Sequence, residues 1–388
     1  MCPPGAGIVI RIIEPLIQGW THVPVNAALV DILCRAFPHE TICFAAEFHH
    51  LAAVRREVEA ASAKEGPGGR SRVVWEVIPG RNHARGCRGF ILSRVGGGDF
   101  LVLTHINPSL LFFIKGFAAL RGCRCQVVLH SNLNRIQGWR SRNPFIRWRD
   151  LKSALGFPLA RNRIQYIVLE NAIRESLLER IPRLAGRVAV LEHPIPMSTA
   201  RGTKALPSSP LTIGFVGLCS LDRGFLEFLH IAETLGDRVA FHAVGALASG
   251  VDVDLSPLAL PPHGEKLDRA VFVTRLLELD FICMPYPPEA YTLSASGVLL
   301  DAVAAGIPTI AYPFPILEDL VRRYGDIGHI CHSRGEMVDL ISSLADGVDG
   351  EGYKRQRKNL AAITRDRENG ALSPAYRAGL GRFIPGGR

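Results

Sequence analysis

Residues 291–313 read YTLSASGVLLDAVAAGIPTIAYP, a polar loop that runs into an apolar helix and then into a strand. Ser294, Ser296 and Gly297 are residue types typical of a helix start, because a serine hydroxyl accepts from first-turn N–H groups and glycine bends freely. The apolar run 307–312 then predicts a buried strand. This order of loop, helix and strand indicates one repeating unit of an α/β fold.

A helix start with bare N–H groups is suited to a phosphate or diphosphate, because the positive end of the helix dipole lies there. Gly297 leaves the backbone bare, and Asp301 follows one turn later. A carboxylate facing the same way would repel a phosphate, so we expect Asp301 to accept hydrogen bonds from sugar or ribose hydroxyls beside it. The plain alternative is that the serines only cap the helix. From this stretch alone, a ligand site and a simple cap are equally good interpretations.

Composition sets the outer bounds of the fold. The chain has 388 residues, of which 47% are hydrophobic, so it exceeds the usual size of a single core and predicts two domains. No apolar run is long enough to span a membrane, and the N-terminus lacks the basic start of a signal peptide. Nine cysteines without a CxxC pair indicate reduced core thiols in a cytoplasmic protein. The net charge of +9 suits an anionic partner without choosing its class.

Short β-branched apolar runs alternate with helical patterns in both halves of the chain. Such alternation predicts two doubly wound, Rossmann-like parallel sheets that face a cleft. The small, polar residues 197–210 are the natural linker. We therefore expect an N-terminal domain over 1–196, a C-terminal domain over 211–370, and a tail, 371–388, that can pack back on the N-terminal domain.

Ligands of such sheets bind outside the carboxyl ends of the strands, where several candidate residues fall. Gly19 follows the first strand, and its backbone can approach a phosphate or sugar, although a plain turn glycine explains it equally well. Arg223 lies just before a helix and can hold an anion, whereas its alternative is a solvated charge. His130 ends the run QVVLH, and a structural histidine is the alternative there.

At this point the sequence resembles a known family. Four segments of the second half resemble the nucleotide-binding domain of GT-B glycosyltransferases, closest to retaining family 4. These segments are IGFVGLCSLDRGFLEFL (213–229), FHAVG (241–245), DFICMPY (280–286) and SASGVLLDAVAAGIPTIAY (294–312). The first half matches through Gly19, HSNL (130–133) and EHP (192–194).

The resemblance implies that 1–196 is the acceptor-side domain and 211–370 the donor-binding domain, and it implies a role for each matching residue. Arg223 corresponds to the basic residue that holds the donor diphosphate, Asp301 to the second glutamate of a paired motif that contacts the ribose, and His130 to a histidine near the transferred sugar. As catalytic candidates we therefore name His130, Arg223 and Asp301. The expected donor-binding residues are Gly19, Gly217, Arg223, Tyr291, Ser294, Ser296, Gly297, Val298 and Asp301.

Two positions depart from the family pattern. The first glutamate of the paired motif falls on Leu293, unless a shift in the loop gives its role to Tyr291 or Thr292. The usual arginine after the strand glycine is Leu218. Substrate contacts are therefore expected to differ from those of standard members.

The reaction implied by the resemblance transfers a sugar from a UDP- or GDP-type nucleotide sugar to an acceptor hydroxyl, with retention and without a metal or other cofactor. The acceptor would be a glycan or a lipid-linked molecule in polysaccharide or glycolipid assembly. The sequence shows neither His or Cys spacing for a metal nor a GxGxxG at the first strand. A GT-B nucleotide-sugar epimerase and an inactive binding scaffold stay open as alternatives.

Residues 135–163 combine basic and aromatic side chains. Arginine and tryptophan together are typical of a surface that dips into lipid headgroups, whereas a solvated basic loop is the plain alternative. No nucleic-acid-binding motif accompanies them, so nucleic acid is not an expected partner. We predict that the segment docks the protein peripherally on the anionic inner membrane face. Its members are Arg135, Arg140, Arg142, Arg147, Arg149, Lys152, Arg161 and Arg163, with Trp139, Phe145, Trp148 and Phe157 interleaved and Asp150 as the acid.

Overall fold

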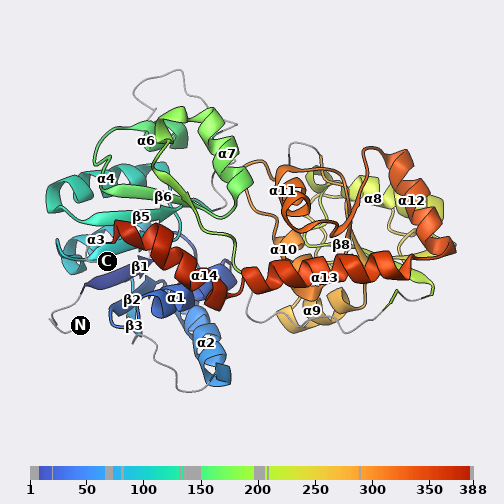
Figure 1. Ribbon diagram of the computed structural model, residues 1–388, viewed down its shortest axis with the longest axis horizontal. Helices are drawn as coiled ribbons and strands as arrows, with labels where there is room; N and C mark the ends of the chain where they lie inside the picture. The colour runs from blue at the N-terminus through green and yellow to red at the C-terminus, as the bar shows by residue number, and fades with distance from the viewer. Residues whose placement is uncertain are drawn as a thin grey trace. The chain divides into compact units, whose positions relative to one another are not determined.

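The computed structural model describes residues 8–19, 21–65, 73–79, 83–130, 133, 136, 150–195, 206–207, 209–287 and 290–384. The chain folds into two compact units (Figure 1). The first unit comprises Met1–Met197, Leu293–Ala295 and Arg367–Arg388, and the second comprises Ser198–Thr292 and Ser296–Asp366. The C-terminal residues from Arg367 onward thus belong to the same unit as the N-terminus.

The first unit is built on a parallel sheet with strand order β3-β2-β1-β4-β5-β6-β7. Every strand enters this sheet at the same edge, because each connection returns through a helix or loop to the edge where the previous strand began. The strands are β1 (Val9–Ile13), β2 (Thr41–Ala46), β3 (Val73–Val77), β4 (Phe100–Leu103), β5 (Arg124–Val128), β6 (Ile164–Val168) and β7 (Val188–Val190).

Helices lie on both faces of this sheet (Figure 1). Helix α4 shows how local sequence sets their ends: the Asn107 side chain accepts from the N–H of Leu110 at 2.8 Å, and Gly122 ends the helix at φ 75°. The elements are α1 (Val23–Ala36), α2 (Phe48–Glu65), α3 (His83–Arg94), α4 (Pro108–Arg121), α6 (Leu151–Gly156), α7 (Asn171–Arg180), η2 (Pro182–Leu184), α14 (Asn369–Ala375), η4 (Tyr376–Leu380) and η5 (Gly381–Phe383).

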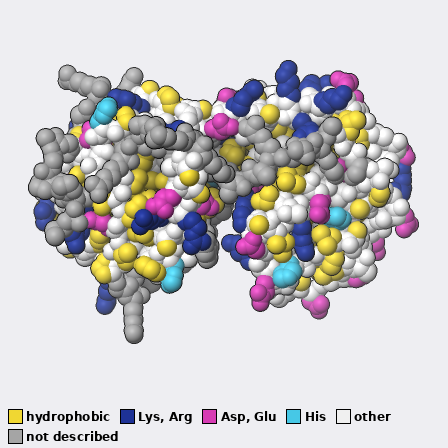
Figure 2. Space-filling model, turned by 90° about the horizontal axis from the view of Figure 1, so that it is seen from below, with side chains coloured by type: hydrophobic (Ala, Val, Ile, Leu, Met, Phe, Trp, Pro, Cys, Tyr) yellow, Lys and Arg dark blue, Asp and Glu magenta, His cyan; other side chains and the backbone are white. Residues whose placement is uncertain are grey.

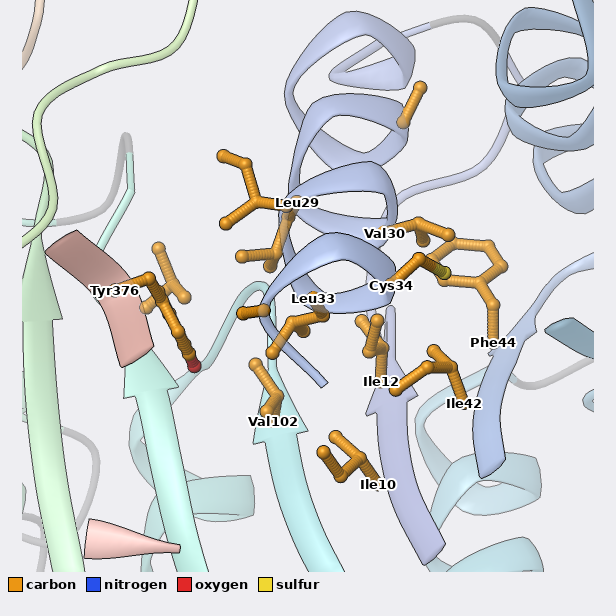
Figure 3. Packing of buried hydrophobic residues seen from close by; sticks show 14 of the residues in the cluster. Ile10, Ile12, Leu29, Val30, Leu33, Cys34, Ile42, Phe44, Val102 and Tyr376 are labelled. Atoms are coloured by element: carbon orange, nitrogen blue, oxygen red, sulfur yellow. The ribbon is translucent and has the colours of Figure 1, made fainter. Parts of the chain in front are cut away.

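The core of the first unit includes the end of the chain. Ile10 and Ile12 of β1 pack against Leu33 of α1, and Tyr376 joins the same cluster (Figure 3). The Tyr376 hydroxyl donates to the side chain of the buried Gln126 in β5. The C-terminal segment is therefore an integral part of this core.

The second unit has a smaller parallel sheet with strand order β12-β11-β10-β8-β9. Four buried phenylalanines form the centre of its core: Phe215, Phe225, Phe228 and Phe241. Its strands are β8 (Leu211–Val216), β9 (Val239–Val244), β10 (Phe281–Met284), β11 (Thr309–Ala311) and β12 (Gly328–Ile330). Its helices are η3 (Leu221–Arg223), α8 (Phe225–Leu235), α9 (Arg269–Leu277), α10 (Gly297–Ala305), α11 (Pro315–Tyr324), α12 (Arg334–Asp346) and α13 (Gly350–Asp366).

The fold class predicted from the sequence, two doubly wound Rossmann-like domains, is confirmed by these two parallel sheets. Residues 291–313, predicted to form a loop, a helix and a strand, contain α10 and β11 of the second unit in that order. The loops that follow the parallel strands of a sheet all lie at one edge of it, and the candidate site residues belong to these loops or to the helices after them.

A buried ion pair anchors the point where the chain returns to the first unit. Arg367 is fully buried and holds Glu170 through two hydrogen bonds, at 2.6 and 2.8 Å. Its Nε lies 3.4 Å from Glu192, and its carbonyl accepts from the N–H of Ile195 at 3.3 Å. The chain segments before residue 198 and after residue 366, where it leaves and re-enters the first unit, are thus tied together.

We expect Arg367→Ala to destabilise the first unit by about 3–5 kcal/mol, because it leaves the Glu170 carboxylate buried without its partner. Urea unfolding followed by tryptophan fluorescence measures this, since all four tryptophans precede residue 150. Arg365→Ala is the matched control: Arg365 is exposed, and its loss should change stability by less than about 0.5 kcal/mol. Equal unfolding midpoints for the two variants would contradict the anchor.

Candidate functional site

Each sheet has one place where the order of strands reverses. In the first sheet it lies between β1 and β4, and in the second between β8 and β10. The loops that follow these paired strands diverge to opposite faces, which leaves a crevice outside the carboxyl ends, and this is where α/β sheets bind ligands. The candidate residues are therefore best described by their position relative to these two crevices.

Glycines bring the backbone together at the crevice of the second sheet. Gly217 follows β8 at φ 95°. A Cβ added to Gly245 would lie 1.7 Å from the carbonyl oxygen of Gly217. A Cβ on Gly224, which has φ 77°, would lie 1.9 Å from the carbonyl oxygen of Pro285. Only glycine fits at Gly245 and Gly224, so the loops after β8, β9 and β10 can converge without side chains between them.

The start of α10 is at the same crevice. Ser296 caps the helix by accepting from the N–H of Leu299 at 3.2 Å, as the sequence pattern predicts. Gly297 is exposed at the first helical position, while Val298 is buried and its side chain would lie 3.1 Å from a Cβ on Gly217. The first turn of α10 therefore faces the loop after β8.

An aromatic group lies beside this helix start. The ring of Tyr286 is 5.0 Å from that of Tyr291 and 5.8 Å from that of Phe314, between centroids. Burial raises the pKa of the Tyr286 phenol well above its ordinary value, and the nearby charge of Arg223 partly offsets that rise. Tyr286, which the sequence analysis did not single out, thus lies between Tyr291 and Phe314, where the charge of Arg223 acts on its hydroxyl.

Arg223 is the last residue of η3, directly before α8. Its side chain is half-buried, and within the part of the chain that the structure describes it makes no ion pair. Tyr291 has φ 57°, an uncommon left-handed conformation for a tyrosine, and it leads into the α10 start. Ser294 lies in the short stretch Leu293–Ala295, which groups with the first unit.

Asp301 has a partner that the sequence analysis did not foresee. Its Oδ1 lies 2.8 Å from Nη2 of Arg269, the first residue of α9, and its side chain is only 15% exposed. Burial raises the pKa of the Asp301 carboxyl, and Arg269 partly offsets this effect. Any hydroxyl bound by Asp301 would therefore meet a carboxylate that Arg269 already orients.

A buried carboxylate organises the crevice of the first sheet. Glu14, fully buried after β1, accepts from the N–H groups of Leu16 and Ile17 at 3.0 and 2.9 Å. It also accepts from Asn26 of α1 at 3.1 Å and from the Thr104 hydroxyl after β4 at 2.7 Å. One side chain thus fixes the loop after β1 to both neighbouring elements.

The same network reaches Gly19. Nδ1 of the buried His50 lies 2.7 Å from the carbonyl oxygen of Gly19, and its Nε2 lies 2.8 Å from Nδ2 of Asn26. Because a carbonyl oxygen only accepts, Nδ1 carries the proton and Nε2 accepts from Asn26. Gly19 itself has φ 66° with open space where a Cβ would be, so its conformation rather than its size requires glycine.

His130 belongs to a group of four histidines at this edge. The ring of His22 is 5.6 Å from that of His105 and 4.6 Å from that of His130, and the rings of His130 and His193 are 5.5 Å apart. Burial lowers the pKa of His22 and of His193 to about 4 and that of His130 well below its usual value, with mutual repulsion adding to the effect.

The sequence analysis found only one member of this histidine group. His105 closely follows β4 and His193 follows β7, so the signal available for them was the same strand-end position that singled out His130. No group of three or more His, Cys, Asp or Glu among the described residues is arranged to hold a metal ion. The lowered pKa values favour the neutral imidazole at His22, His130 and His193, and a neutral imidazole has one donor and one acceptor.

Membrane-spanning helices and surface charge are further features of the described residues to compare with the sequence predictions. Of the helices that the structure describes, none combines the length and apolarity needed to cross a bilayer. On the face shown in Figure 2, outside the grey residues, basic side chains are interspersed with acidic and apolar ones. The charge of the candidate site therefore comes from individual residues at the strand ends.

No protein-family model matches the sequence, and the search of curated proteins finds no match either. Solved structures do match. HepE from Anabaena, in complex with UDP, is 12% identical with a TM-score of 0.63, covering 97% of this chain and 100% of its own. TarM is 10% identical with a TM-score of 0.64, covering 99% and 100%. The pneumococcal O-GlcNAc transferase GtfA, in complex with UDP and GlcNAc, is 10% identical with a TM-score of 0.59, covering 98% and 100%. At these identities the likeness shows a shared fold.

The histidine group predicts how stability depends on pH. Below about pH 6.5 these histidines become protonated in the unfolded chain, whereas their lowered pKa values keep them neutral in the folded chain until the pH is lower. The first unit should therefore lose stability as the pH falls from about 6.5 toward about 4. Urea midpoints followed by tryptophan fluorescence between pH 7.5 and 4.5 measure this slope.

His193→Asn should flatten that slope, because it removes one of the protons taken up on unfolding. The exposed His39 supplies the matched control, His39→Asn. A slope in His193→Asn as steep as in His39→Asn would show that the group does not titrate as described.

Proposed function

We propose that the protein is a glycosyltransferase that moves a sugar from a UDP-sugar to an acceptor hydroxyl. The observation that carries the proposal is the reversal point of the second sheet, where the capped start of α10 faces the bare loop after β8 that leads to Arg223. The shared fold supports it, since HepE and GtfA were both solved with UDP. A UDP- rather than GDP-type donor is proposed on the same ground.

The proposed chemistry is electrostatic. Negative charge grows on the diphosphate as the sugar leaves, and a guanidinium beside free helix N–H groups stabilises that charge without reorganising. Arg223 and the backbone of Ser296, Gly297 and Val298 would supply these groups, with the bare loop at Gly217 allowing close approach. Retention of configuration and independence of a metal are proposed from the family resemblance.

Asp301 would bind the ribose hydroxyls of the donor. Burial raises the pKa of Asp301, while its ion pair with Arg269 favours the charged form, and a charged acceptor binds hydroxyls more strongly than a neutral one. From the family resemblance we also propose that His130 contacts a sugar and that the backbone of Gly19 approaches a phosphate or sugar.

We further propose that the acceptor is a glycan or lipid-linked molecule and that the protein docks peripherally on an anionic inner membrane face. The residues predicted to dock are 135–163, of which 135 and 137–149 lie outside the described residues. Arg161 and Arg163 precede β6, at the edge opposite His130, because β5 and β6 run parallel. The segment therefore crosses the unit, and its basic residues cannot all lie beside His130.

Liposome co-sedimentation tests the membrane proposal. Each basic residue near an anionic surface contributes about 1 kcal/mol, so binding should require anionic lipid and should be released by salt. Trp139→Ala with Trp148→Ala should weaken it further. Binding that ignores lipid charge, or that survives both the double substitution and high salt, would rule the docking out.

A catalytically inactive binding scaffold is the second candidate. Leu293 replaces a glutamate of the resembling family and is buried, and Leu218 replaces an arginine and is 44% exposed. A panel of nucleotide sugars, assayed for nucleotide release with and without acceptor extract, distinguishes the two. Acceptor-dependent release from one donor supports the transferase, and UDP binding without any release supports the scaffold.

We expect Arg223→Ala to lower turnover by about 10²–10³-fold, because one charge-stabilising donor is lost. Arg223→Lys should lose less, since it keeps the charge but not the planar fork. Asp301→Ala should weaken UDP binding, measured by calorimetry, because a desolvated partner is lost. Release rates from the best donor of the panel give the turnover values.

The matched control is Arg238→Ala, which removes an exposed arginine at the amino edge of the same sheet, where it pairs with Asp346. Exposed pairs contribute little, so activity should not change. Unchanged turnover in Arg223→Ala, or unchanged UDP affinity in a folded Asp301→Ala, would remove that residue from the donor site.

A further inference from the structure

The chain from β4 to β6 carries charge of almost one sign. Between Phe100 and Leu169 the sequence contains 11 basic residues and one acidic residue, Asp150. Asp150 is buried at the start of α6, where its carboxylate accepts from the N–H groups of Lys152 and Ser153. The single acid of this stretch therefore caps a helix, and no other acid of the stretch offsets the basic residues.

The ends of α3 and α4 meet at the edge of the first sheet where its strands begin. The loop between α3 and β4 lies against the end of α4, since a Cβ on Gly97 would lie 3.0 Å from the carbonyl oxygen of Arg121. The Arg163 side chain, just before β6, donates to the carbonyl oxygen of Gly122. Five exposed arginines belong to this amino edge: Arg94, Arg121, Arg124, Arg161 and Arg163.

These arginines keep their charge uncompensated. Within the part of the chain that the structure describes, none of the five forms an ion pair, and the partners of Arg124 and Arg163 are neutral carbonyl oxygens. Asp99, the acid of the loop before β4, already pairs with Arg11 at 2.7 Å. The amino edge is therefore a positively charged surface.

Residues 157–163 run along α4 at this edge. The ring of Phe157 packs against that of Phe112 in α4, with 5.3 Å between centroids. At the other end of the segment, Arg163 reaches Gly122, which ends the helix. The residues between these two contacts therefore lie beside the last turns of α4.

Exposed apolar side chains lie among the arginines. Leu120, in the last turn of α4, is 88% exposed, more than any other large hydrophobic residue that the structure describes. Phe157 and Leu159 are exposed as well. One exposed leucine is ordinary, but three apolar side chains among five uncompensated arginines are typical of a surface that contacts lipid headgroups.

The combination of charge and apolar side chains selects the partner. Two copies of this chain joined through the amino edge would bring like charges together, which opposes association. Nucleic acid carries the right charge, but a leucine has no π face on which a base can stack. An anionic lipid surface suits both features, because it attracts arginines and takes apolar side chains out of water.

We propose that the amino edge of the first sheet docks on anionic lipid, with Leu120 among the headgroups and the five arginines at their phosphates. The inference rests on the membrane docking proposed above and assigns the contact to the edge opposite His130. The five residues of β5 separate the two edges by about 17 Å. The crevice of the first sheet would then face away from the lipid, so an acceptor has to extend into water to reach it.

Co-sedimentation of the full chain with phosphatidylcholine vesicles, with and without phosphatidylglycerol, tests this docking. We expect binding only where phosphatidylglycerol is present, and release by salt. Leu120→Glu should weaken binding by about tenfold or more, because it removes an apolar contact and adds a charge that the lipid repels. An unchanged urea midpoint shows that this exposed substitution leaves the fold intact.

Phe48→Glu is the matched control, because Phe48 is also exposed, at 59%, but follows β2 at the carboxyl edge of the same sheet. It should bind as the unmodified protein does. Arg94→Gln with Arg121→Gln should weaken binding by about fivefold per arginine. Arg55→Gln with Arg238→Gln removes the same net charge from arginines that already pair with carboxylates, and it should leave binding unchanged.

Three outcomes overturn the proposal: no binding of the unmodified protein to phosphatidylglycerol vesicles, equal binding by Leu120→Glu and Phe48→Glu, or a dimer in solution that Leu120→Glu dissociates. Loss of binding in Leu120→Glu but not in Trp139→Ala with Trp148→Ala supports this edge as the contact. UDP affinity and nucleotide release are measured without lipid, so failure of the docking and failure of the transferase proposal are separate results.

Discussion

The structure depends on one constraint, that a parallel strand must be entered from the same edge as its neighbour. All strand-following loops of a unit therefore gather at one edge, and every candidate of both sheets belongs to such a loop or to the helix after it. The constraint also separates residues that are close in sequence. Arg163 and His130 lie at opposite edges because a parallel pair, β5 and β6, lies between them.

Close approach of the backbone distinguishes the crevice of the second unit. Gly245 and Gly224 each lie where a Cβ would overlap a carbonyl oxygen, so the loops after β8, β9 and β10 pack as bare chain. The buried Tyr286 packs beside Tyr291 and Phe314, close to where the chain enters α10. Arg223 follows in the loop after β8, directly before α8, and a cation at a helix start favours an anion.

The crevice of the first unit is organised by hydrogen bonds rather than by glycine. Glu14, Asn26 and His50 form a buried chain that ends on the Gly19 carbonyl. Each member is satisfied by the next, so the loop after β1 is held in one conformation at the edge where neutral histidines collect. The same network holds Gly19 against the start of α2 through His50 and Glu47.

The sequence by itself determined the two-sheet class, the order of elements around 291–313 and the Ser296 cap, because these follow from local periodicity and from side chains bonding their own backbone. It did not reveal β12, a short half-buried strand with little apolar signal. Only the tertiary structure decided that Asp301 pairs with Arg269, that four histidines meet, and that Arg367 returns the chain end to Glu170. Those partners lie on separate elements, and their meeting depends on strand order, which no local pattern encodes.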